Sequence, residues 1–354
     1  MKNKILRRCL IALGIIVAAV VILLGCVRLG EKLIYKSFYD NAEQKFKMPG
    51  TSDNLVQQGF DYVNYNGDND TSNDFYLVAG YMSDDTASMV YVLDTDGNIK
   101  NKVRLKKADG SDYTGHTGGI ECYGNYVYIT DGDKDVSYDG GLDVFPLDQI
   151  LNDTEALCAG RVKTYNNPAF CHIYKNYMLV GEYYKEVDYE TLDSHRIETP
   201  AGDKNTALIM VFELDNSEEF KLSKKPVAAI TTTNAIQGLT TIGNEQIVLS
   251  SSWGLSTSNL YFYDMSKINT TNIELVSISG NDESSTEDDL ELKVYHLDSA
   301  SLVNTVEAPP MAEEMVCLNN ELYILNESAC NKYIFGKFMS GNYIYAYDVS
   351  YIYE

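Results

Sequence analysis

The longest uninterrupted apolar stretch of the chain lies close to its N-terminus. Residues 10–27 read LIALGIIVAAVVILLGCV, eighteen residues without a charged side chain. A helix rises about 1.5 Å per residue, so a stretch of this length nearly matches the hydrocarbon core of a bilayer. We therefore expect a transmembrane signal-anchor over residues 10–27, preceded by a short cytoplasmic tail over residues 1–9.

The charges before this segment predict its orientation. Lys2, Lys4, Arg7 and Arg8 precede it, and no acidic side chain lies among them. Basic flanking residues favour the cytoplasmic side of a membrane. The sequence thus predicts a single-pass membrane protein whose N-terminus is cytoplasmic and whose C-terminal domain is extracellular.

A second interpretation of the same stretch is a lipoprotein signal. Residues 23–26, LLGC, resemble a bacterial lipobox, in which Cys26 would carry a lipid after cleavage. The apolar run is longer than the core of most signal peptides, and residues 28–49 resemble a juxtamembrane helix or linker. These two features favour the uncleaved anchor, and both interpretations leave the rest of the chain on the same side.

Beyond residue 50, apolar and polar positions repeat with strand spacing. One pattern consists of an aliphatic residue, an aromatic residue, any residue, Leu or Tyr, and a final Asp. Its six copies end at Asp94, Asp148, Asp215, Asp264, Asp298 and Asp348. Each Asp begins a polar turn, in which its carboxylate can accept hydrogen bonds from nearby backbone N–H groups. A structural role is therefore expected for these acids.

A second repeat precedes five of these six strands and consists of two short strands joined by a turn. Its apolar anchor positions are Phe60, Ile120, Cys171, Leu239 and Met315. Repeats of several short strands at such spacings are typical of propeller blades. Five complete copies favour an all-β, five-bladed β-propeller over residues 50–354, and six or seven blades remain open. The unpaired copy ending at Asp298 is expected to follow an insertion in the fourth blade, around residues 281–291.

The same repeats resemble those of exported, membrane-anchored β-propeller proteins of Gram-positive bacteria, a loosely defined group. The stretches that carry the resemblance are HTGGIECYGNYVYITD, IQGLTTIGNEQIVLSSSWG and APPMAEEMVCLNNELYILNESACNKYIFG. The resemblance covers approximately residues 50–350 and implies the architecture. It implies little about activity, because one fold serves many functions.

Composition and charge narrow the classes of partner. The chain contains 28 Tyr and 1 Trp, and aromatic residues of this kind suit half-buried sheet surfaces. The formal net charge is −23, although residues 1–36 are basic. A domain this acidic repels nucleic acid, so we expect no nucleic-acid partner.

The propeller topology predicts a cluster of polar side chains at one mouth of the central channel. Loops that enter each innermost strand and loops that leave each second strand meet at one face. These loops carry the candidate ligand-binding residues Gln58, His116, Gln237, Glu313, Glu314, Trp253 and Glu327. The expected site is polar, rich in acid, and contains the single Trp.

Calcium is the one cofactor that the sequence suggests. Glu313 and Glu314 are adjacent, and carboxylates brought together near a narrow axis raise one another's pKa or hold a cation. Asp131, Asp133 and Asp135 alternate along one loop, which lets their oxygens point at a common ion. This loop lacks the Gly and Glu of an EF-hand, so a solvated turn is the default interpretation there.

Catalytic motifs are missing from the sequence. It contains no GxSxG, HExxH, P-loop or GxGxxG pattern. We therefore expect a binding or scaffolding module at the cell surface, with a cell-envelope glycan, a peptide or another exported protein as its ligand. The alternative function is a calcium-assisted hydrolase or lactonase that uses Glu313, Glu314 and His116 around the ion.

Overall fold

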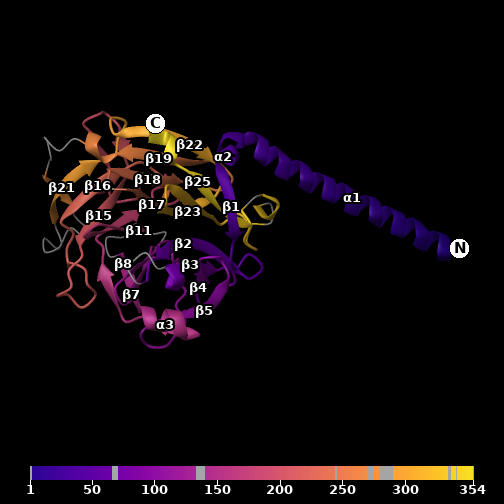
Figure 1. Ribbon diagram of the computed structural model, residues 1–354, viewed down its shortest axis with the longest axis horizontal. Helices are drawn as coiled ribbons and strands as arrows, with labels where there is room; N and C mark the ends of the chain where they lie inside the picture. The colour runs from indigo at the N-terminus through magenta and orange to yellow at the C-terminus, as the bar shows by residue number, and fades with distance from the viewer. Residues whose placement is uncertain are drawn as a thin grey trace.

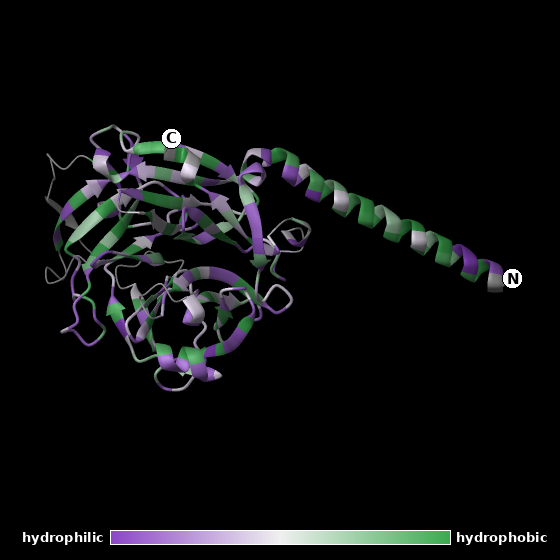
Figure 2. Ribbon diagram, viewed as in Figure 1, coloured by the Kyte–Doolittle hydropathy of each residue, from purple (hydrophilic) through white to green (hydrophobic). Residues whose placement is uncertain are grey.

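The apolar N-terminal stretch is helical, as predicted. The computed structural model describes residues 2–65, 71–132, 140–243, 245–268, 275–278, 290–333, 336–339 and 341–353. Helix α1 (Lys2–Ile34) projects away from the rest of the molecule (Figure 1). Figure 2 shows hydrophobic residues along most of this helix and hydrophilic ones near its N-terminal end. Its length and composition are those of a single-pass membrane segment or a signal sequence.

The remaining chain forms five blades around a central channel (Figure 1), so the predicted five-bladed propeller is confirmed. In blades 1 and 2 the strands follow one another from the channel outwards. Blade 1 consists of β2 (Leu55–Val63), β3 (Phe75–Met82), β4 (Met89–Asp94), β5 (Ile99–Lys106) and the short β9 (Glu155–Leu157). Blade 2 consists of β6 (Ile120–Tyr123), β7 (Tyr126–Asp131), β8 (Gly141–Pro146) and β10 (Gly160–Lys163).

Blades 3 and 4 begin in the same way at the channel. Blade 3 consists of β11 (Pro168–Tyr174), β12 (Tyr177–Glu182), β15 (Ala207–Glu213) and β16 (Ala228–Thr232), followed outwards by β21 (Leu290–His296) and β20 (Leu275–Ile278). Blade 4 consists of β17 (Ile236–Ile242), β18 (Gln246–Ser251), β19 (Ser258–Asp264) and β22 (Leu302–Ala308).

Blade 5 combines strands from both ends of the chain. It consists of β23 (Ala312–Leu318), β24 (Glu321–Asn326), β25 (Tyr343–Asp348) and β1 (Ala42–Lys47). Short elements lie between these strands or beside them: α2 (Lys36–Asp40), α3 (Leu147–Asn152), the pair β13 (Ile197–Glu198) and β14 (Lys204–Asn205), and the 3-10 turns η1 (Thr71–Asn73), η2 (Asp193–His195), η3 (Met265–Lys267), η4 (Gly336–Phe338) and η5 (Ser350–Tyr353).

The hydrophobic core lies between neighbouring blades. Leu77 and Val90 of blade 1, for example, pack in one cluster with Ile129 and Phe145 of blade 2. The predicted anchor positions all lie on innermost strands and are at most 1% exposed: Phe60, Ile120, Cys171, Leu239 and Met315. The second repeat therefore marks the strand pair of each blade that begins at the channel.

All seven cysteines are free thiols.

The insertion in blade 4 contributes to a different sheet. Residues 281–289, most of the predicted insertion, lie outside the described residues. Strand β21, between β19 and β22, pairs parallel with β16 of blade 3. Val294 of β21 is buried in the core of that blade together with Leu290 and Leu292. The sixth copy of the strand pattern is thus an added outer strand and does not mark a sixth blade.

The propeller begins earlier than residue 50, the predicted boundary. The sequence predicts a linker over residues 28–49, whereas residues 42–47 form β1, the outermost strand of blade 5. Ala42 lies opposite Tyr347 and Lys47 opposite Tyr343. The strand buries only one large apolar side chain, Phe46, so its pattern carries almost no strand signal. Pairing of β1 with β25 closes the ring of blades.

The segment between α1 and β1 packs against the propeller. Phe38 of α2 is 2% exposed, and its ring stacks on Tyr347 at 5.4 Å between ring centroids. The Tyr35 hydroxyl lies 3.1 Å from Oγ1 of Thr257, in the loop between β18 and β19. These contacts attach the end of the long helix to blades 4 and 5.

The closing strand gives a direct test of the fold. Phe46 is 8% exposed and lies 5.0 Å from Tyr76 between ring centroids. Phe46→Ala should lower the free energy of unfolding by about 3 kcal/mol, because a buried aromatic side chain is lost. The exposed neighbour is the control: Lys47→Ala should change it by less than about 0.5 kcal/mol. Urea unfolding of the full chain in detergent micelles, followed by circular dichroism, measures both. Equal effects would contradict a closing role for β1.

Candidate functional site

The central channel is lined by strand edges whose N–H groups lack a ladder partner. Such groups are costly when they are buried, so an acceptor has to reach them. Glu314 of β23 supplies one acceptor for three other blades. Its Oε2 accepts hydrogen bonds from the backbone N–H groups of Phe60 at 2.7 Å and Ile120 at 3.1 Å. Its Oε1 accepts one from Cys171 at 3.4 Å. Glu314 is therefore a structural element of the channel.

Two further acids follow the same rule between neighbouring blades. Asp61 Oδ2 accepts from the N–H of Cys122 at 2.9 Å, and Glu121 Oε2 accepts from the N–H of Ile173 at 3.1 Å. Burial raises the pKa of Asp61 well above its usual value, and raises the pKa of Glu121 to about 8. Burial also lowers the pKa of His172, beside Glu121, to about 4. The channel therefore favours uncharged forms of its ionisable groups.

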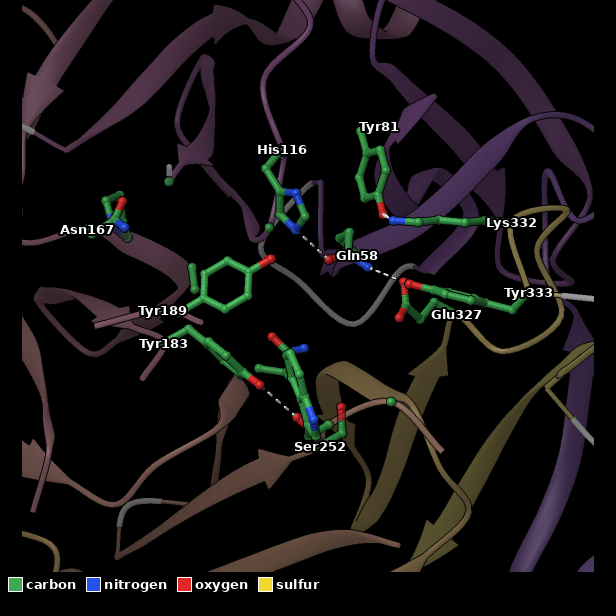
Figure 3. A pocket seen from close by; sticks show the side chains of 17 residues that line it. Gln58, Tyr81, His116, Asn167, Tyr183, Tyr189, Ser252, Glu327, Lys332 and Tyr333 are labelled. Carbon is green, nitrogen blue, oxygen red and sulfur yellow. Dashed lines mark hydrogen bonds between the residues drawn. The ribbon is translucent and has the colours of Figure 1, made fainter. Parts of the chain in front are cut away.

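A pocket of about 310 Å³ opens at one mouth of the channel (Figure 3). Residues from all five blades line it, and five of them are aromatic: Tyr81, Tyr183, Tyr189, Trp253 and Tyr333. Tyr183 and Tyr189 meet edge to face at 5.4 Å between ring centroids, and Tyr189 and Trp253 do so at 6.3 Å. The pocket thus has a largely aromatic wall along blades 3 and 4.

A chain of hydrogen bonds crosses the opposite side of the pocket. Nε2 of His116 lies 3.0 Å from Oε1 of Gln58, and Nε2 of Gln58 donates to Oε2 of Glu327 at 2.7 Å. Figure 3 shows Gln58 between these two side chains. The His116 ring stacks on Tyr81 at 4.7 Å, and the Tyr81 hydroxyl also bonds Nζ of Lys332. These contacts fix the polar side chains relative to one another.

Two buried carboxyl groups lie at the base of this network. Glu327 is 8% exposed and Glu313 is 2% exposed. Burial raises the pKa of Glu327 to about 7, while Lys332 and hydrogen bonds from Tyr333 and Gln58 oppose the shift. Burial also raises the pKa of Glu313 well above its usual value, and the charge of Glu327 adds to this. Burial therefore raises the pKa of both acids at the base of the pocket.

The predicted residues divide into three groups in the structure. Those that line the pocket are Gln58, His116, Gln237, Trp253 and Glu327. Glu313 is buried beside Gln237, whose Nε2 lies 3.4 Å from Oε1 of Glu313. Glu314 lies in the channel and does not share a site with Glu313. Within the described residues, no group of three or more His, Cys, Asp or Glu side chains could hold a metal ion. The calcium centre predicted from Glu313, Glu314 and His116 therefore does not form.

The second predicted calcium loop is only partly described. Asp131 Oδ2 accepts a hydrogen bond from Nη1 of Arg161 at 2.9 Å, and the same nitrogen bonds Asp143 at 2.9 Å. Asp133 and Asp135 lie outside the described residues. Calcium at this loop stays a prediction.

Several pocket residues were not predicted from the sequence, above all Tyr81, Tyr183, Tyr189, Lys332 and Tyr333. Tyr81 lies at the end of the second strand of its blade, and the other four follow that strand, as do the predicted residues Trp253 and Glu327. The chain contains 28 tyrosines, so the residue type alone does not identify the few that line a pocket. Their position after the second strand of a blade could have identified them, because these loops lie at the face of the propeller that carries the pocket.

The fold and the site together define a five-bladed β-propeller that carries an N-terminal apolar helix. No family model and no curated protein matches the chain. Solved structures are similar at the level of the fold. The PQQ-bound aldose sugar dehydrogenase of Streptomyces coelicolor is 10% identical with a TM-score of 0.45, over 86% of this chain and 95% of that one.

Two further structures show a comparable similarity. An oxidoreductase described as a glucose dehydrogenase, from Thermus thermophilus, is 8% identical with a TM-score of 0.42, over 86% of this chain and 98% of that one. The WD40 β-propeller domain of Doa1 is 10% identical with a TM-score of 0.38, over 87% of this chain and 97% of that one. Similarities at these identities concern the fold alone.

The role of Glu314 can be tested by removing its acceptor oxygens. Glu314→Ala should lower the free energy of unfolding by about 2 to 4 kcal/mol, because buried N–H groups of three blades lose their partner. Glu314→Gln should lose less, since its amide oxygen can replace Oε2. The exposed acid Glu213, at the opposite end of blade 3, is the control, and Glu213→Gln should have no effect. Urea unfolding measures the series, and an Ala variant as stable as the wild type would contradict the role.

Proposed function

We propose that this protein is a membrane-anchored binding or scaffolding module whose propeller lies outside the cell membrane. Its ligand occupies the pocket at the channel mouth. The observation that carries the proposal is this pocket of about 310 Å³, lined from all five blades by aromatic and amide side chains. Pockets that bind small molecules are apolar hollows of this size with a few fixed polar groups.

The chemistry of the wall supports a glycan or peptide fragment of the cell envelope as the ligand. Tyr189 and Trp253 offer flat apolar surfaces, and Trp253 is 40% exposed. The amide groups of Asn167 and Gln237 also line the pocket and can bond hydroxyl or peptide groups. Aromatic rings with a polar surround suit ligands that are apolar on one face and polar at the edge.

Because Trp253 is the only Trp of the chain and lines the pocket, its fluorescence reports binding directly. Titration of the full chain in detergent micelles with soluble peptidoglycan fragments should give a saturable change in emission. Tyr189→Ala and Gln58→Ala should weaken binding at least about tenfold, and Glu213→Gln should not. A flat titration with glycan and peptide fragments, together with no heat of binding by calorimetry, would overturn the proposal.

The proposed orientation rests on the basic residues that precede the apolar segment, since these favour the cytoplasmic side. Protease added to intact protoplasts should digest the propeller and spare the N-terminal tail. A propeller that is digested only after lysis would contradict the orientation. A labelled lipid on Cys26 would replace the spanning helix by a lipoprotein anchor and leave the side unchanged.

A further inference from the structure

The aromatic side chains around the pocket already hold ammonium groups of the chain itself. Nζ of Lys332 lies 4.8 Å from the ring centroid of Tyr81 and 5.5 Å from that of Tyr333. Nζ of Lys185 lies 5.4 Å from the ring centroid of Trp253. A cation within about 6 Å of an aromatic centroid is attracted by the negative face of the ring. The pocket walls are therefore arranged to accept positive groups.

The base of the pocket favours the same sign of charge. Glu327 lines the pocket and is hydrogen-bonded to Gln58, and Glu313 is buried close by. The charge of Glu327 acts on Glu313. Lys332 is the single basic residue other than His116 among the pocket-lining residues that the structure describes, and it is exposed on the rim. A ligand with an ammonium group would compensate both buried carboxyls, and a ligand with an acidic group would be repelled.

We infer that the pocket binds an ammonium group of its ligand, held between the carboxylate of Glu327 and the aromatic walls, and that this ligand is an amino sugar of a glycan. This inference rests on the proposed binding function and specifies its ligand class. The flat surfaces of Tyr189 and Trp253 favour a sugar ring over a flexible side chain. The amide group of Gln237 also lines the pocket and can bond a hydroxyl group of such a ring.

Lys332 has an opposing role in this arrangement. It occupies the faces of Tyr81 and Tyr333, and its charge acts on Glu327. An incoming ammonium group therefore competes with Lys332 for the same carboxylate and the same rings. Removing the lysine side chain should strengthen ammonium binding, whereas removing the charge of Glu327 should weaken it.

The test compares two probes that differ only in their amino groups. A chitosan oligosaccharide carries free amines, and its fully N-acetylated form has the same sugar backbone without them. Titrations follow Trp253 emission near pH 7, where the sugar amines and Glu327, whose pKa burial raises to about 7, are both partly ionised. Because the chain has a net charge of −23, salt of about 0.3 M is added to screen long-range attraction.

The free amine form should bind at least about tenfold more tightly than the acetylated form. Glu327→Gln should abolish this preference, Lys332→Ala should increase it, and Glu213→Gln should leave it unchanged. Lys332 is exposed, so its variant keeps the test valid if Glu327→Gln fails to fold. Circular dichroism verifies the fold of each variant.

Several results would overturn the inference. Equal or tighter binding of the acetylated form would show that the pocket recognises the sugar ring and not its amine. The proposed binding function would still hold. If Glu327→Gln still prefers the free amine form, the carboxylate of Glu327 does not hold the ammonium group. Tighter binding of a lysine oligopeptide than of the chitosan oligosaccharide would reject the glycan. Failure of both sugars, together with a positive titration by other envelope fragments, would reject the ammonium group while the proposed function stands.

Discussion

The closed ring of blades brings five innermost strand edges face to face across a narrow channel, and their N–H groups need hydrogen-bond acceptors. Carboxylates provide these acceptors. Glu314 bonds backbone N–H groups of three blades, and Asp61 and Glu121 each bond the next blade in the ring. Side chains with oxygen acceptors are therefore favoured at these strand edges, since a buried N–H group without a partner costs free energy.

The same constraint extends to the pocket. Glu313 and Glu314 are consecutive and lie where the pairing of β23 with β24 shifts its register, between Ala312 and Met315. Glu314 bonds the strand edges of blades 1 to 3. Glu313 contacts Gln237 at the pocket, and the charge of Glu327 raises the pKa of Glu313. One pair of adjacent acids thus serves two functions: Glu314 stabilises the ring, and Glu313 contributes to the electrostatics of the mouth.

Much of the architecture could be predicted because each blade buries its own copy of one apolar pattern, anchored for example at Ile120 and Leu239. The closing strand β1 could not, because only Phe46 is strongly apolar there and its partner strand lies at the other end of the chain. The role of Glu314 was equally hidden, since its hydrogen bonds join residues 143 to 254 positions apart. Pocket tyrosines such as Tyr189 were missed because tyrosine is abundant and only the loop position distinguishes them.

The pocket and helix α1 are supported by the same loops. The loop between β24 and β25 carries Glu327, Lys332 and Tyr333 into the pocket, and its turn η4 contacts α1. The loop between β18 and β19 carries Trp253, and its Thr257 lies against Tyr35 at the end of the helix. Any ligand that moves Lys332 or Trp253 acts on loops that pack against the helical segment. The contacts that hold helix α1 to the propeller therefore also fix the direction in which the pocket faces relative to that helix.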